Sequence, residues 1–344
     1  MGQPIAQARS VTQGIFSIIF FSLHQEHRIS EAFAREGIGI SRQLLSQWVL
    51  KCGKILSPLY NELEKQILQS RSLFIDETTI DMQMPGKGKV HQAYMRVVAS
   101  GGADPPYRLY HFRTNRKHEN AKQILKGYNG IVHSDKYGAY EQLANQKQFL
   151  WCPCFAHIRR KFFEAESGDL EFRNWMLRKI KYLFLLEKVA WKRTEEERQE
   201  IRKKQEEPIL EELIEKAKGR LLKGKILPKS KLKEALGYFC SLIPYIKNYT
   251  KDANAKLENN TAERAIRPIA IGRKNWLFVG SEAGGHAAAV LLSLVQSCRS
   301  SGVNPREYLE DVMRRLMEHN SQKLHELLPI EWANSKKIKN NPHG

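Results

Sequence analysis

The chain has 344 residues, of which 42% are hydrophobic and 9% aromatic, a composition typical of a globular protein with two or three structural units. Lys and Arg total 56 against 37 Asp and Glu, and the resulting net charge of +19 favours a polyanionic partner such as nucleic acid, the alternative being a basic protein with no such role. The five scattered cysteines exclude a secreted disulfide framework and indicate a reducing cytoplasm, and the longest apolar stretch, residues 15–23, is shorter than the roughly 20 residues of a membrane span.

The first predicted elements form a helix, a glycine turn and a second helix between residues 28 and 56. Ile29 to Glu36 reads as the first helix, and Ser41 is the expected N-cap of the second. Leu59 to Leu68 is predicted as a third amphipathic helix. This outline resembles a helix-turn-helix that reads DNA, although any small helical hairpin would produce the same pattern.

From residue 72 the periodicity becomes that of strands. Ser72–Asp76, His91–Ser100 and Tyr107–Arg113 are predicted as strands separated by Pro- and Gly-containing turns. A helix over residues 116–126 and a buried strand at Ile131–His133 follow. These elements predict a mixed α/β sheet that presents strand-terminal acids at one edge, where ligands of such sheets collect.

The rest of the chain is mostly helical in its pattern. We interpret the charge-dense residues 192–207 as a solvated helical face with alternating signs and no chemistry. The basic tail at residues 336–339 is predicted to be disordered. The remaining predicted elements are helices at 140–145, 156–166, 170–250, 286–298 and 305–318 and a strand at 149–154.

Three carboxylates stand in informative positions: Asp76 ends an apolar run, Asp135 follows a buried strand, and Glu263 lies three residues after Asn260. Each has a structural alternative, since the aspartates fit turns and Asn260 with Glu263 resembles a capping box. Carboxylates that converge at a sheet edge need a cation to offset their repulsion, and oxygen ligands favour Mg²⁺ or Mn²⁺ over zinc. We therefore predict a two-ion centre that cuts or joins nucleic acid.

Other acids and a cysteine motif are rival ligands. Glu77 should point away from the side that Asp76 uses, because successive strand residues alternate faces, and Asp81 lies further along. Cys154 and His157 belong to a Cys-Pro-Cys-Phe-Ala-His segment that offers too few ligands for a usual zinc site.

Basic residues cluster around the third acid and after the cysteine motif. We expect them to contact DNA phosphates, with an aromatic ring stacking on an unpaired base, whereas the alternative makes the aromatic residue part of the core. The predicted DNA-binding residues are His157, Arg160, Arg264, Arg267, Arg273, Lys274 and Trp276.

At these positions the chain resembles the IS66 family of bacterial insertion-sequence transposases. The resemblance extends over about residues 31–308 and rests on four segments in a fixed order. They are Phe74-Ile75-Asp76-Glu77-Thr78, His133-Ser134-Asp135-Lys136-Tyr137-Gly138-Ala139-Tyr140, Cys154-Phe155-Ala156-His157-Ile158-Arg159-Arg160-Lys161-Phe162, and Asn259 to Pro268, continuing to Trp276.

The resemblance implies an RNase H-like mixed sheet of the DDE kind, with Asp76, Asp135 and Glu263 as the metal-binding triad. It implies a catalytic core over residues 71–300 with a helical insertion at about 170–250. A helical N-terminal unit at residues 1–70 and a C-terminal helical extension with a basic tail at residues 301–344 would flank it. The implied reaction is hydrolysis at the ends of the element and attack of the freed 3′-hydroxyl on target DNA, with two Mg²⁺ or Mn²⁺ ions.

The expected partner is double-stranded DNA, both element ends and target, and holding two ends implies a homo-oligomer, with accessory transposition proteins as further partners. A bacterial cytoplasm, at the nucleoid, is the expected location, with no membrane. Members of the family commonly carry a longer amino-terminal region. In this chain the matching segment begins near Phe20, and this difference supports the alternative of a truncated, non-catalytic DNA-binding remnant. A nuclease without strand transfer is a further alternative.

Overall fold

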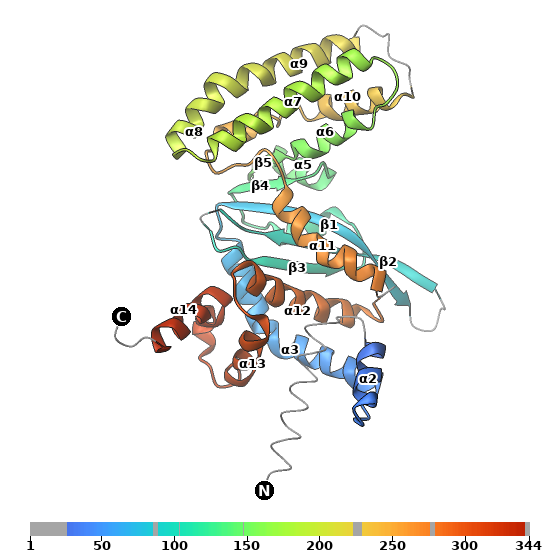
Figure 1. Ribbon diagram of the computed structural model, residues 1–344, viewed down its shortest axis with the longest axis vertical. Coiled ribbons are helices and arrows are strands. Elements are labelled where there is room, and N and C mark those ends of the chain that lie inside the picture. Colours follow the sequence, from blue (N-terminus) through green and yellow to red (C-terminus); the bar gives the residue numbers. More distant parts are fainter. Residues whose placement is uncertain are drawn as a thin grey trace. The chain divides into compact units, whose positions relative to one another are not determined.

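The computed structural model of the protein describes residues 26–340 except 85–88, 103, 147, 223–228 and 276–278. The chain forms two compact units (Figure 1). Unit 1 consists of Met1–Ser70, Asp76–Asn120 and Thr261–Gly344, and unit 2 consists of Arg71–Ile75 and Ala121–Asn260. Each unit is thus built from segments that are distant in sequence.

The strands form a mixed sheet in the order β3-β2-β1-β4-β5. Strand β2 pairs antiparallel with β3, whereas β1 pairs parallel with β4, and β4 parallel with β5. The start of β1 belongs to unit 2 and its remainder to unit 1. The predicted mixed α/β class is confirmed, and the arrangement is compatible with an RNase H-like core. The strands are β1 (Ser72–Met84), β2 (Lys89–Ala99), β3 (Arg108–Arg113), β4 (Ile131–Ser134) and β5 (Leu150–Pro153).

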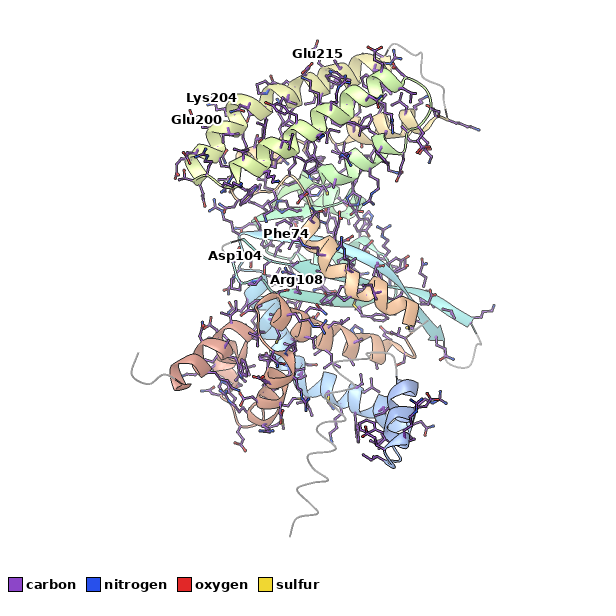
Figure 2. All side chains as sticks on the ribbon, viewed as in Figure 1. Phe74, Asp104, Arg108, Glu200, Lys204 and Glu215 are labelled. Atoms are coloured by element: carbon purple, nitrogen blue, oxygen red, sulfur yellow. The ribbon has the colours of Figure 1, made fainter. Side chains whose placement is uncertain are left out.

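In unit 1, helix α12 (Glu282–Ser300) lies directly on the edge strand β3 (Figure 1). The backbone N–H groups of Arg108 and Tyr110 donate to the hydroxyls of Ser297 and Ser293, at 2.9 and 2.8 Å. An edge strand normally leaves such donors unpaired, so the serines of α12 satisfy them. Figure 2 labels Arg108, whose guanidinium also donates to the Ser100 carbonyl at 2.6 Å.

The long helix α3 (Arg42–Ile67) also packs against α12. Its predicted N-cap is confirmed, because Ser41 Oγ accepts from the Leu44 N–H at 3.2 Å. The prediction of separate second and third helices is wrong: α3 continues through Pro58. A continuous row of buried, mostly aliphatic residues on one side outweighs the backbone hydrogen bond that proline removes. The other helices of unit 1 are α2 (Glu26–Arg35), α11 (Asn260–Asn275), α13 (Pro305–Arg315), η3 (Ser321–Leu327) and α14 (Pro329–Asn340), with α4 (His118–Ile124) crossing the unit boundary.

The tail prediction is also wrong, because α14 includes residues 336–339. Trp332 packs edge-on against Tyr308, with ring centroids 5.5 Å apart, and the Lys336 ammonium lies 4.4 Å from the Trp332 ring. These contacts anchor a segment whose composition alone indicates disorder. Across the described part of the chain no helix combines the length and apolarity that a membrane crossing requires.

Unit 2 carries β4, β5 and a mostly helical segment that follows them. Within the predicted solvated stretch, Arg198, Arg202 and Glu206 are 6%, 0% and 0% exposed. That prediction is therefore wrong for this face, because the three side chains recur every fourth residue and point inward, where Glu187 neutralises Arg202. The helices of unit 2 are α5 (Gly138–Asn145), α6 (Phe155–Phe163), α7 (Leu170–Ala190), α8 (Glu195–Ile201), η1 (Arg202–Glu206), α9 (Glu207–Leu222), α10 (Lys231–Ser241) and η2 (Asn248–Lys251).

Candidate active site and nucleic-acid interface

Asp76 lies within β1 of unit 1 and is half-buried. The sequence predicts that a strand ends at Asp76, and this prediction is wrong, because β1 continues to Met84 alongside β2. Its Oδ1 accepts from the Glu77 N–H at 2.8 Å. The Glu77 carboxylate accepts from buried Arg96 at 2.8 Å and from Arg116. Glu77 is thus held by two guanidinium groups, consistent with a structural role.

Asp135 follows β4 of unit 2, where the sequence predicts it, and is half-buried. The Ser134 hydroxyl accepts from the Trp151 indole at 2.9 Å and donates to the Asp135 carbonyl at 2.8 Å. The ammonium of Lys136 donates to Ser241 Oγ at 2.5 Å. Burial and the charge of Asp135 raise the pKa of the Tyr238 phenol, so that this group remains protonated beside the carboxylate.

The parallel pairing of β1 and β4 sets the register of the chain just before both aspartates. Phe74 pairs with His133, two residues ahead of Asp76 and Asp135 respectively. The two paired rings are stacked, with centroids 4.3 Å apart and an interplanar angle of 14°. Both strands therefore approach these acids side by side and in the same direction within unit 2.

His133 fixes this pairing through both ring nitrogens. Its Nε2 accepts from the Lys256 N–H at 2.7 Å, so its Nδ1 carries the proton and donates to the Leu73 carbonyl at 3.2 Å. Burial lowers the pKa of His133 to about 3, despite the opposing effect of the Leu73 hydrogen bond. The ring is therefore a neutral structural tie between β4, β1 and the segment that leads to α11.

Asn259 is a residue whose role the sequence does not reveal. Its side chain is 1% exposed, and its Nδ2 donates to the Ile75 carbonyl at 2.8 Å, immediately before Asp76. Its backbone N–H donates to the sulfur of Cys154 at 3.3 Å. Asn259 thus joins the end of the part of β1 that pairs with β4, the start of α6 and the start of α11. The Asn259-Asn260 pair ahead of a helix was the one local signal, and capping explains that pattern equally well.

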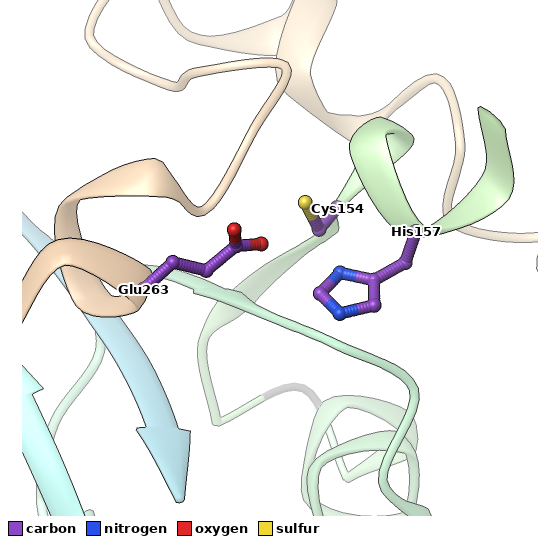
Figure 3. Close-up of side chains that lie close together, drawn as sticks. All are labelled: Cys154, His157 and Glu263. Atoms are coloured by element: carbon purple, nitrogen blue, oxygen red, sulfur yellow. The ribbon is translucent and has the colours of Figure 1, made fainter. Parts of the chain in front are cut away.

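The cysteine motif lies at the start of α6. Cys154 is the buried N-cap residue, and His157 lies one turn later with a ring nitrogen within 4.8 Å of the Cys154 sulfur. Arg160 is exposed on the next turn. Figure 3 shows Cys154 at the start of α6, His157 on α6 and Glu263 on α11. Within unit 2 the structure therefore brings the motif against Asn259, and the side chain of Arg160 faces solvent.

Glu263 lies in the first turn of α11 in unit 1 and is half-buried, while Arg264 and Arg267 are exposed. The Tyr110 hydroxyl of β3 donates to the Ala265 carbonyl at 2.6 Å, which fixes the helix on the sheet. The convergence of Asp76, Asp135 and Glu263 stays a prediction. The predicted DNA contacts of Arg273, Lys274 and Trp276 fall on side chains outside the described residues.

Comparison with known proteins matches two segments of the chain to one group of transposases. Residues 10–287 match the Transposase IS66 family, and residues 293–330 match the IS66 C-terminal element. Three proteins of Sinorhizobium fredii (strain NBRC 101917 / NGR234) are similar over most of the chain, and all three are named as uncharacterized.

Uncharacterized protein y4hP is 30% identical over 336 residues, which cover 91% of this chain and 60% of that protein. Uncharacterized protein y4qI is 31% identical over 305 residues, covering 85% and 56%, and y4jD is 30% identical over 321 residues, covering 89% and 62%. The chain thus spans about three-fifths of the length of these relatives. Since the family match covers most of its length, the chain belongs to the IS66 family of transposases.

Proposed function

We propose that the chain is a DDE transposase that cleaves DNA at insertion-sequence ends and transfers the strand into target DNA. Asp76, Asp135 and Glu263 are proposed to hold two Mg²⁺ or Mn²⁺ ions. The observation that carries this proposal is the parallel pairing of β1 with β4, in which Phe74 and His133 stand opposite each other two residues before the aspartates. Membership of the IS66 transposase family supports it.

The connection to the third acid gives further support. Asn259 binds the Ile75 carbonyl, so the residue before Asp76 and a residue four positions before Glu263 are joined within unit 2. The segments that carry Asp76 and Glu263 therefore both begin at this hydrogen bond. This local order would limit how far the two carboxylates can separate.

The chemistry of these side chains fits hard divalent cations. Three carboxylates offer oxygen atoms only, which Mg²⁺ and Mn²⁺ prefer. When bound, such ions activate the attacking oxygen and stabilise the departing one. The proposed part of the protein is to position the scissile phosphate, with the exposed Arg264 and Arg267 of α11 and Arg160 of α6 contacting the DNA backbone. His157 is proposed to assist at the start of α6, and Arg273, Lys274 and Trp276 further along α11 are proposed DNA contacts.

The proposed partners are the two ends of the element and a target duplex. Holding two ends together requires a homo-oligomer or accessory transposition proteins, and the reaction would take place on bacterial DNA in the nucleoid. A non-catalytic DNA-binding remnant is the second candidate, because a net charge of +19 favours DNA binding without requiring cleavage. A nuclease without strand transfer is the third.

The test is a cleavage and joining assay on labelled duplexes that carry the neighbouring element ends, with Mg²⁺ or Mn²⁺. Wild type is compared with Glu263→Gln and with Glu282→Gln, a matched change of an exposed glutamate at the start of α12. We expect Glu263→Gln to abolish cleavage and joining without loss of DNA binding, and Glu282→Gln to retain both. DNA binding without cleavage by wild type would establish the remnant, and cleavage without joining would establish the nuclease.

A further inference from the structure

Helix α3 of unit 1 presents a polar face to solvent along its first half. Gln43, Gln47, Lys51 and Lys54 are all exposed. At 100° per residue their directions fall within about 80° of one another, so they form one stripe, which we call the polar face of α3. Leu50, which is 39% exposed, lies along the same stripe. From Gln43 to Lys54 the stripe is about 16 Å long.

Within residues 37–61, which include this face, all charged side chains are positive. Residues 37–61 contain no Asp or Glu, whereas they contain Arg42, Lys51 and Lys54. Arg42 is exposed in the first turn of α3, which has no acidic residue and where the helix dipole adds positive potential. By contrast, the first turn of α8 carries three consecutive glutamates. The polar face of α3 is thus an electropositive surface, and the acidic residues of its own helix follow only after residue 61.

The opposite side of α3 is anchored rigidly. Leu45, Val49 and Leu56 are buried there. A Cβ atom added to Gly53 would lie 2.7 Å from the Cβ of Ala287, so α3 and α12 approach each other as closely as their backbones allow. Because α12 is fixed to β3 by serine hydroxyls, the polar face is held on the sheet scaffold of unit 1.

The turn that precedes α3 is also fixed. The Ser30 hydroxyl of α2 donates to the Ile40 carbonyl at 2.6 Å, and Gly37 adopts a φ of +78°, which favours glycine. Ser41 then caps α3. Helix α2 is therefore joined to α3 by a turn of fixed conformation, as in helix-turn-helix pairs that place one helix in a DNA groove.

We propose that the polar face of α3 enters the major groove of duplex DNA and contacts base edges. The B-DNA major groove is about 12 Å wide and admits one α-helix, and the stripe covers roughly three helical turns. Glutamine pairs with adenine edges, a leucine side chain can contact a thymine methyl group, and the lysines contact phosphates on either side. The phosphates on both sides of the groove supply the negative charge that complements the lysines of this stripe. This inference deepens the proposed function, because it names the surface that selects the DNA end.

The experiment measures binding of the full chain to labelled duplexes by fluorescence anisotropy, in EDTA so that no cleavage occurs. One duplex carries an element end and a second carries the same bases in shuffled order. Gln43→Ala/Gln47→Ala removes the proposed base contacts, and Lys51→Ala/Lys54→Ala removes the phosphate contacts. The matched control is Lys203→Ala/Lys204→Ala, which removes two exposed lysines from η1 of unit 2.

The glutamine variant should lose about ten-fold or more in affinity for the element end and less than about two-fold for the shuffled duplex. The Lys51/Lys54 variant should lose affinity for both duplexes, and its dependence of log K on log salt should fall by about two. The control should keep the wild-type slope. Unchanged circular dichroism of each variant shows that the fold is retained.

Chemical protection provides a second measurement that needs no variant. Bound element-end DNA should protect Lys51 and Lys54 of the wild type from acylation, while Lys204 stays reactive. If the wild type binds DNA, the variants bind it with unchanged affinity and Lys51 and Lys54 stay open to acylation, this inference is overturned and the proposed function is left intact. Failure of the wild type to bind any duplex would overturn both. Equal loss for both duplexes in the glutamine variant would overturn base reading.

Discussion

Arg202 is the most completely buried cation among the described residues of unit 2, and replacing it by methionine should be strongly destabilising. It is 0% exposed and donates five hydrogen bonds. Two reach the Glu187 carboxylate at 2.6 and 2.9 Å, and three reach the carbonyls of Tyr249, Asp252 and Ala255. All five guanidinium donors are used. Replacing Arg202 leaves the carboxylate of Glu187, a residue that is 5% exposed, buried without its cation.

The expected cost of Arg202→Met is about 3–5 kcal/mol of unfolding free energy, because breaking a buried pair leaves its partner uncompensated. Glu187→Leu combined with Arg202→Met should recover at least about 2 kcal/mol of this, since the stranded charge is then gone. The control is Lys204→Met, also on η1, which breaks an exposed pair with Glu200 of α8 (Figure 2) and should cost at most about 0.5 kcal/mol.

Native-state hydrogen exchange of amides in α7 and η1, at pH 7 with increasing denaturant, measures these free energies for unit 2 itself. A cost for Arg202→Met no larger than that of Lys204→Met would refute the reasoning. So would a double variant less stable than Arg202→Met alone, because the cost would then arise from lost packing and not from a stranded charge.

Three further predictions concern other buried groups. Asn259→Ala should raise the Mg²⁺ concentration for half-maximal cleavage by about ten-fold, because the buried Ile75 carbonyl then lacks its donor. The Kd for DNA measured in EDTA should change less than about two-fold. An unchanged metal titration would contradict a positioning role for Asn259. Burial raises the pKa of Glu206 to about 8 from its ordinary value of 4.5, so its contribution to stability is complete below pH 4.5 and lost as pH rises to 8. In thermal melts over that interval, Glu206→Gln should therefore flatten the decline in stability, and an unaltered profile would disprove the assignment. A Cβ on Gly285 would lie 2.6 Å from the Phe112 ring, so Gly285→Ala should cost about 1–3 kcal/mol, whereas Gly284→Ala, 3.4 Å from its nearest neighbour, should be neutral or stabilising in the same melts.

Local patterns predict well those elements that local interactions determine. The apolar run ending at His133 predicts a buried strand that delivers Asp135, and the structure places β4 there. Ser41 before an apolar period predicts a helix start, which its hydrogen bond to Leu44 confirms. In both cases the decisive residues are within a few positions of the element that they define.

Long-range partners determine what the pattern misses. Beyond Asp76 the sequence contains several polar residues, and β1 continues because β2 lies beside it. Asn259 binds the carbonyl of a residue 184 positions earlier, and no local periodicity signals such a contact. Arg202 is read as a solvated charge because the sequence does not show that Glu187, on another helix, faces it.

These missed contacts converge on one segment, residues 249–259, which leads into α11. Arg202 holds three of its carbonyls, His133 binds its Lys256 N–H, and the Phe155 N–H donates to the Leu257 carbonyl at 3.0 Å. Asn259, the last residue of the segment, donates to the Ile75 carbonyl. The buried ion pair between α7 and η1 and the strand that precedes Asp135 thus fix the same stretch of backbone. Burying a charged pair rarely increases stability relative to apolar packing, so its use here is better explained by the order that it imposes on this segment.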